Sequence, residues 1–166
     1  ANAEQPMAYC KHDGSLDEGF EIVTHPMTLD FHLHRMPWER IVEEAKRLGY
    51  TSHQAGTCGL HVHVNRNAFG NSESTQDVAI ARTLFFFEKF WDELLKFSRR
   101  TQGQLNQWAA RYGYKDQPQE ILDHAKSGRH AGRYTAVNLT NADTVEFRMF
   151  RGTLKYNTLI ATLEPV

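Results

Sequence analysis

The chain has 166 residues, of which 40% are hydrophobic and 23% charged, and its formal net charge is −1. This is an ordinary globular composition, and the near-zero charge gives no electrostatic reason to expect a nucleic acid or a membrane surface as partner. Two cysteines do not make a disulfide framework, so we predict a reducing compartment, the cytoplasm. At this length one domain with a substantial core is expected.

The first half of the chain predicts two strands and one helix. A polar lead-in without strong periodicity covers residues 1–12, and a strand follows near residues 20–24. A helix is predicted over residues 38–48, because its apolar side chains fall on one stripe and Gly49 suits the C-cap. A second strand covers residues 59–64.

The second half predicts one long helix and several shorter elements. Residues 77–97 contain no Gly or Pro, and Ser74 with Asp77 gives a capping signal before them. Further elements are predicted as helices at 104–111 and 119–126, strands at 134–139 and 144–150 joined by a loop of hairpin length, and a last helix from residue 156. This order predicts an α+β fold with a mainly antiparallel sheet.

Three of the predicted strands alternate apolar residues with chemically active ones. Because successive side chains of a strand point to opposite faces, His61 and His63 share one face, and Glu146 and Arg148 share another. Glu21 is one acid in an otherwise apolar strand. Such strands predict a sheet with one apolar face and one face that carries imidazoles, carboxylates and a guanidinium.

Two imidazoles two residues apart on a strand can converge on one metal ion or one phosphate. For His61 and His63 this competes with a plainer interpretation, a strand whose outer face is rich in histidine. Cys58 adds a third potential ligand, so a zinc-dependent hydrolase that uses Cys58, His61 and His63 is an alternative. A structural zinc site needs a fourth ligand, which the nearby sequence does not obviously offer.

The acidic residues favour a harder ion than zinc. Burying the carboxylate of Glu21 is costly without a partner or a metal. Asp13 lies eight residues earlier, beyond a turn, and could return to the same ion. Together with Glu146 and a histidine, these acids are typical ligands of Mg²⁺ or Mn²⁺, which also bridge phosphates.

Three arginines could supply positive charge for such phosphates, because a guanidinium binds oxyanions bidentately. They are Arg133, Arg148 and Arg151. For Arg133 and Arg151, taken singly, ordinary surface ion pairing explains the charge as well.

Several segments resemble the amidoligase family, a branch of the glutamine synthetase and glutamate–cysteine ligase superfamily. They read KHDGSL from residue 11, GFEIVTHPM from residue 19, CGLHVHV from residue 58, RYTAVNL from residue 133 and VEFRMFRGTL from residue 145. The likeness spans roughly residues 10–163. It implies a carboxylate–amine ligase with a curved antiparallel sheet, helices on one face, metal ions on the concave face and ATP at one end.

The resemblance also implies a mechanism, in which ATP phosphorylates a carboxylate and an amine attacks the acyl phosphate. Substrates would be small-molecule or peptide carboxylates and amines. The residues assigned to this chemistry are Asp13 and Glu21 for one ion, His61 and Glu146 for a second ion, His63, Arg133 and Arg151 for the nucleotide phosphates, and Arg148, Arg133 and Glu21 for catalysis.

The chain departs from the family pattern at both ends. Family members usually open with a strand of the Gly-x-Glu-x-Glu kind, which is missing from residues 1–166, and the last helix stops early. We therefore expect a fragment whose first strand a partner chain or a second copy could supply. A non-catalytic partial domain that binds a nucleotide or a partner is a further alternative.

Overall fold

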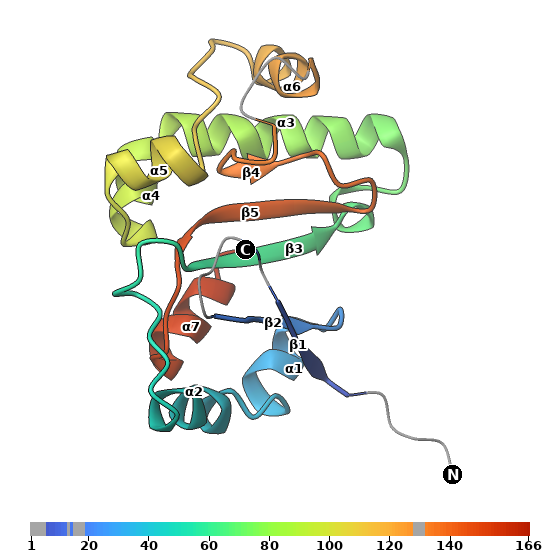
Figure 1. Ribbon diagram of the computed structural model, residues 1–166. Helices are drawn as coiled ribbons and strands as arrows, with labels where there is room; N and C mark the ends of the chain where they lie inside the picture. The colour runs from blue at the N-terminus through green and yellow to red at the C-terminus, as the bar shows by residue number, and fades with distance from the viewer. Residues whose placement is uncertain (1–5, 13, 15–18, 128–131) are drawn as a thin grey trace. The chain divides into compact units, whose positions relative to one another are not determined.

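The computed structural model describes residues 6–12, 14, 19–127 and 132–166. Their contacts divide the chain into two compact units, one of residues 1–58 and 152–165, the other of residues 59–151 and Val166. The described residues form seven α-helices, a two-stranded antiparallel sheet and a three-stranded antiparallel sheet (Figure 1). The predicted α+β class is therefore confirmed, whereas a single curved sheet of the glutamine synthetase type stays a prediction.

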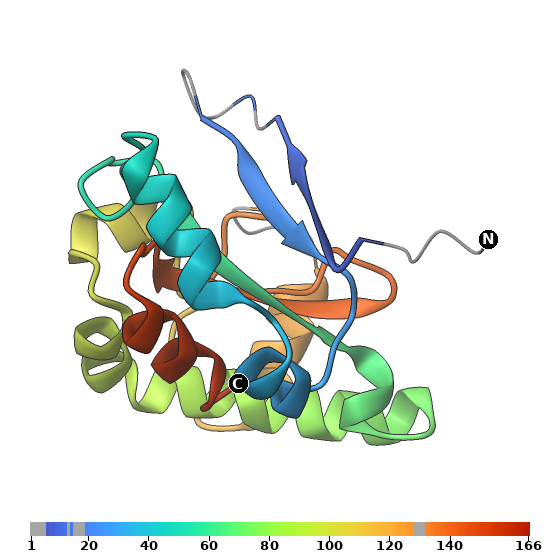
Figure 2. The ribbon, with the colours of Figure 1, turned by 90° about the horizontal axis from the view of Figure 1, so that it is seen from below.

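The first unit combines a strand pair with three helices. Strands β1 (Ala8–Lys11) and β2 (Glu21–Thr24) pair antiparallel, with Cys10 opposite Ile22 (Figure 2). Helices α1 (Leu29–His34), α2 (Trp38–Arg47) and α7 (Tyr156–Leu163) complete the unit. Its buried cluster consists of Met36, Trp38, Val42 and Leu159, with Ile22 and other half-buried residues packed around it.

Two elements of this unit differ from the sequence prediction. The polar lead-in contains β1, whose residues are mostly exposed and therefore show no apolar alternation. Helix α1 was not predicted either, because it has only six residues and buries none of them fully. The hydroxyl of Thr28 caps it by accepting from the Phe31 amide.

The second unit contains the three-stranded sheet, in the order β3-β5-β4. Its strands are β3 (Gly59–Asn65), β4 (Val137–Asn138) and β5 (Thr144–Arg151), and Figure 1 shows β5 between its two neighbours. The other elements are the 3₁₀ turn η1 (Arg66–Phe69) and helices α3 (Glu73–Lys89), α4 (Trp91–Ser98), α5 (Gln102–Trp108) and α6 (Pro118–Lys126). Among the helices described, none combines the length and apolar character that a membrane crossing requires.

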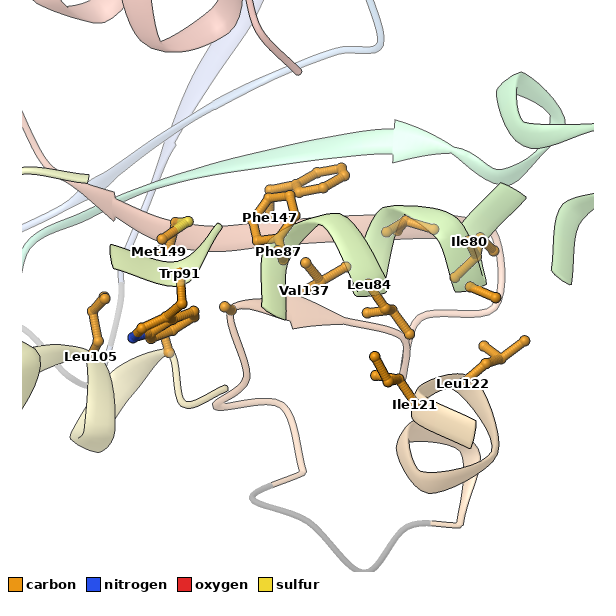
Figure 3. Close-up of a cluster of buried hydrophobic side chains, with 14 of the residues drawn as sticks. Ile80, Leu84, Phe87, Trp91, Leu105, Ile121, Leu122, Val137, Phe147 and Met149 are labelled. Carbon is orange, nitrogen blue, oxygen red and sulfur yellow. The ribbon is translucent and has the colours of Figure 1, made fainter. Parts of the chain in front are cut away.

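The main core lies between this sheet and helices α3 to α6. Val145, Phe147 and Met149 are buried, which confirms the predicted apolar face of β5. Phe147 meets Phe87 of α3 at a ring-centroid distance of 5.5 Å, and Figure 3 shows Leu84 of the same helix among the buried side chains.

The long helix predicted over residues 77–97 is two helices. Helix α3 ends at Lys89 and α4 begins at Trp91, with Phe90 between them. The amide of Phe90 still donates to the Phe86 carbonyl, so the helical hydrogen bonds continue up to the break. The chain changes direction there although the segment contains no Gly or Pro. The cap also lies earlier than predicted: Ser72 caps α3 together with Thr75 in a reciprocal capping box.

A β-bulge interrupts the β3–β5 ladder. Leu60 pairs with Phe150 but Val62 pairs with Phe147, so two residues of β5, Arg148 and Met149, lie opposite His61 alone. Met149 and Phe150 are consequently both buried in the core. Regular alternation resumes after the bulge, so the next residue, Arg151, points away from the core.

Candidate active site

The site is built around Glu146, a carboxylate that is only 5% exposed. Its Oε1 accepts a 2.6 Å hydrogen bond from Nη1 of Arg148, two residues along β5. Two imidazole nitrogens of β3 approach the same oxygen, Nδ1 of His61 at 3.4 Å and Nε2 of His63 at 3.5 Å. The face-sharing predicted for both strands thus brings four polar side chains together.

The other oxygen of Glu146 is held by amides. Nδ2 of Asn138 donates to Oε2 at 2.7 Å, and Nδ2 of Asn141 approaches it at 3.4 Å. Asn138 stands directly opposite Glu146 in the β4–β5 ladder and is 2% exposed. Its own Oδ1 accepts from the Thr140 amide at 3.0 Å, which fixes the orientation of the side chain.

Burial and neighbouring charges set the protonation states of this cluster. Burial, aided by the positive charge of Arg148, lowers the pKa of His61 to about 4, although Glu146 opposes the shift. Burial alone would raise the pKa of Glu146, but the Asn138 hydrogen bond and the Arg148 charge outweigh it and hold that pKa below its usual value. Near neutral pH the site therefore holds an uncharged His61 beside an ionised Glu146.

One nitrogen of Arg148 makes no hydrogen bond to the described residues. Its side chain is 13% exposed, and its buried Nε lacks a hydrogen-bond partner in the described part of the chain. A buried donor without an acceptor costs about 1–3 kcal/mol, so an acceptor brought to this N–H would stabilise the site. The Tyr134 ring lies 5.7 Å from Arg148 Cζ and 5.1 Å from Arg133 Cζ, so both arginines flank one aromatic side chain.

Other contacts orient the edges of the cluster. Nδ1 of His63 and the Thr144 hydroxyl lie 3.1 Å apart and share a hydrogen bond. Arg133 is exposed and donates to the Tyr134 hydroxyl at 3.0 Å. Arg151 lies at the far end of β5, where its Nη1 donates to the Arg99 carbonyl at 3.4 Å.

Apart from Arg133 and Arg151, whose places are given above, the predicted site residues fall into three groups. His61, His63, Glu146 and Arg148 meet, as the sheet pattern predicted. Glu21 lies on β2, in the other compact unit, so its relation to this cluster stays a prediction. Asp13 lies outside the described residues.

The donor types at Glu146 fit a divalent cation in part. An ionised carboxylate and a neutral imidazole are both suitable ligands, and Mg²⁺ commonly takes one or two protein ligands with water and phosphate oxygens completing its shell. Within the described residues, however, no group of three His, Cys, Asp or Glu side chains is placed to hold a metal. This gives no support to the zinc alternative with Cys58, and it leaves Arg148 as the positive partner of Glu146.

Comparison with known proteins decides the family. A family model described as a putative amidoligase enzyme matches residues 2–164, nearly the whole chain. The chain belongs to this family. No curated protein and no solved structure matches it. Membership places the chain among enzymes that form amides, and the family resemblance predicted from the quoted sequence segments is confirmed.

Sequence reasoning missed Asn138, which belongs to the RYTAVNL segment but received no role. The available signal was its place on a strand expected to pair with the strand of Glu146. A polar residue between Val137 and Leu139, both apolar, would be costly to bury without a partner. Glu21, a single acid in an otherwise apolar strand, shows the same pattern.

Proposed function

We propose that this amidoligase is an ATP- and Mg²⁺-dependent carboxylate–amine ligase that works through an acyl phosphate. The observation that carries the proposal is the ionised Glu146, held between Arg148 and Asn138 beside two imidazoles, in a chain of an amide-forming family. Small molecules or peptides would supply the carboxylate and the amine.

The reaction has two balanced steps. A carboxylate oxygen of the acid substrate attacks the γ-phosphorus of ATP, and ADP leaves with the electron pair of the broken P–O bond. The amine then attacks the carbonyl carbon, inorganic phosphate leaves, and the amine nitrogen loses a proton. Both steps need a dense negative charge to be held in place, so positioning and charge neutralisation carry most of the catalysis.

Arg148 is suited to the transferred phosphoryl group. Glu146 occupies its Nη1, while the unpartnered Nε can donate to a phosphoryl oxygen. Because Glu146 and the Tyr134 ring already fix the guanidinium, little rearrangement is needed when charge develops. The neutral His61 and the ionised Glu146 would hold a divalent cation, which would neutralise phosphate oxygens when bound.

The remaining assignments rest on the resemblance. His63, Arg133 and Arg151 would contact the nucleotide phosphates, and Asp13 with Glu21 would hold a further cation. His63 is tied to Thr144 and is half exposed, so one edge of its ring can meet a ligand. Arg133 is exposed and its guanidinium lies over the Tyr134 ring, so it can meet an approaching phosphate.

The test is ADP release by the 166-residue chain with Mg²⁺ and a matrix of carboxylates and amines. We expect release that requires one carboxylate and one amine together. Arg148→Lys keeps the charge but loses the fork of donors, and should reduce turnover about a hundredfold, the scale for one donor at a developing charge. Arg82→Gln, an exposed arginine of α3, is the control. If no pair stimulates ADP release, the proposed reaction is wrong.

A further inference from the structure

Strand β4 brings Asn138 to Glu146, yet it has only two residues, Val137 and Asn138. Its pairing with β5 holds it on one side, and the amide of Arg148 donates to the Ala136 carbonyl at 2.8 Å just before the strand. A strand this short has few ladder hydrogen bonds, because strands usually have five or six residues. The place of Asn138 therefore depends on what holds β4 elsewhere.

Ala110, just after helix α5, holds the chain where β4 is about to begin. It forms a parallel bridge with Thr135. Its amide donates to the Tyr134 carbonyl at 2.8 Å, and its carbonyl accepts from the Ala136 amide at 2.9 Å. Two backbone hydrogen bonds thus fix the segment that leads into the strand.

The hydroxyl of Tyr112 holds β4 itself. Val137 faces Phe147 in the ladder, and the alternation of antiparallel pairs turns its carbonyl away from β5. The Tyr112 hydroxyl donates to this carbonyl at 3.0 Å and lies 3.1 Å from Oγ1 of Thr135. The Thr135 hydroxyl donates to the same carbonyl at 3.1 Å. Burial raises the pKa of Tyr112, so its hydroxyl stays a donor at neutral pH.

Helix α3 fixes Tyr112 in turn, through the buried carboxylate of Glu88, which is 4% exposed. Oε1 of Glu88 accepts from the Tyr112 amide at 2.7 Å, and Oε2 accepts from Nε of Arg111 at 2.8 Å. Nη2 of Arg111 also donates to the Glu88 carbonyl at 3.0 Å. Because α3 belongs to the main core, the Tyr112 hydroxyl meets β4 from a fixed position.

We propose that Tyr112 is a positioning residue for the ligase reaction, which sets the place of β4 and thereby the contact of Asn138 with Glu146. The inference rests on the proposed function and deepens it, because Glu146 and Arg148 are the groups assigned to the cation and the phosphoryl group. The effect of Tyr112 passes through the backbone of β4. Misplacement of a site by about 1 Å can cost about a hundredfold in rate, so a small shift of β4 is enough to matter.

Two variants each remove one hydroxyl from this contact and keep the shape of the side chain, Tyr112→Phe and Thr135→Val. We expect kcat for ADP release to fall about tenfold or more in each. KM for ATP should change little, because the phosphate contact assigned to His63 lies on β3. Tyr114→Phe is the matched control, since it removes a hydroxyl from an exposed tyrosine two residues along the same loop.

The side-chain amide of Asn138 gives a second readout that needs no turnover. Its ¹⁵N and proton NMR signals report the hydrogen bond to Glu146, and we expect them to shift in Tyr112→Phe and in Thr135→Val but not in Tyr114→Phe. Replacing Tyr112 by para-aminophenylalanine returns an N–H donor to the same place. This variant should restore both the Asn138 signals and kcat.

The outcomes separate this inference from the proposed reaction. If Tyr112→Phe and Thr135→Val lower only Tm, and their kcat and Asn138 signals match those of Tyr114→Phe, then the Tyr112 hydroxyl is merely structural and the inference is wrong. Changes that para-aminophenylalanine does not reverse would contradict it as well. If the Asn138 signals behave as expected but no donor pair releases ADP from the wild-type chain, the positional link stands and the ligase reaction fails.

Discussion

The amide of Asn138 donates a 2.7 Å hydrogen bond to Oε2 of Glu146, from the position directly opposite it in the β4–β5 ladder. Both side chains are buried, and the other oxygen of the carboxylate meets Arg148. One neutral donor and one cation thus hold the carboxylate from two sides. Asn138 thus fixes the orientation of the Glu146 carboxylate beside His61.

Asn138→Ala should destabilise the fold by about 1–3 kcal/mol, because it leaves a buried carboxylate oxygen without its shorter hydrogen bond. Asn141→Ala is the matched control, since Asn141 approaches the same oxygen at 3.4 Å and should matter less. Urea denaturation of both variants checks this. Equal losses of stability in the two variants would show that the Asn138 hydrogen bond contributes no more than the Asn141 contact.

Arg148→Met should cost about 3–5 kcal/mol, because removing one partner of a buried pair leaves the Glu146 charge uncompensated. Adding Glu146→Gln should restore much of the loss, since the double variant buries no isolated charge. A double-mutant cycle from denaturation midpoints measures the coupling. Additive effects of the two substitutions would contradict a direct pair.

Phe147→Ala should destabilise the protein by about 3–5 kcal/mol through lost apolar contact and a residual cavity. Phe147 is 4% exposed and packs on Phe87 of α3, whereas Phe86, the neighbour of Phe87 on that helix, is 50% exposed. Phe86→Ala is therefore expected to change stability far less. A wild-type denaturation midpoint for Phe147→Ala would show that the strand faces the other way.

The lowered pKa of His61 predicts how the free energy of unfolding depends on pH in metal-free buffer. Its pKa is about 4 in the folded chain and about 6.5 when unfolded, so between these values the unfolded state binds the extra proton. Stability should therefore fall as the pH decreases from about 6.5 to 4. The lowered pKa of Glu146 acts in the same direction at more acidic pH.

Chemical denaturation across this pH range checks the prediction. His61→Gln should flatten the slope, while substitution of the exposed His12 by Gln should leave it as it is in the wild-type chain. An unchanged slope in His61→Gln would mean that other groups cause the pH dependence.

The strands that carry the site were predictable because their pattern is strong. Alternation in GLHVHV and TVEFRMF fixes which side chains share a face, and the buried Val145, Phe147 and Met149 require that face to be the inner one. The same reasoning placed His61 with His63 and Glu146 with Arg148. Sequence alone, however, does not say that the two strands are neighbours.

The bulge and the β4 register could not be read from the sequence. A loop of four residues, 140–143, would place Asn138 opposite Val145, and the observed register is shifted by one residue to Glu146. A shift of one residue moves a whole strand to the other face. The bulge opposite His61 and the β4–β5 register depend on how the strands pack on the core, which local propensity does not encode.

The central claim is that this chain activates a carboxylate by phosphorylation. The most direct measurement uses a productive acid substrate labelled with ¹⁸O in both carboxylate oxygens, with analysis of the released phosphate by mass spectrometry. An acyl phosphate requires that one ¹⁸O atom appear in the inorganic phosphate, together with stoichiometric ADP. Unlabelled phosphate, or release of AMP and pyrophosphate in place of ADP, would contradict the account.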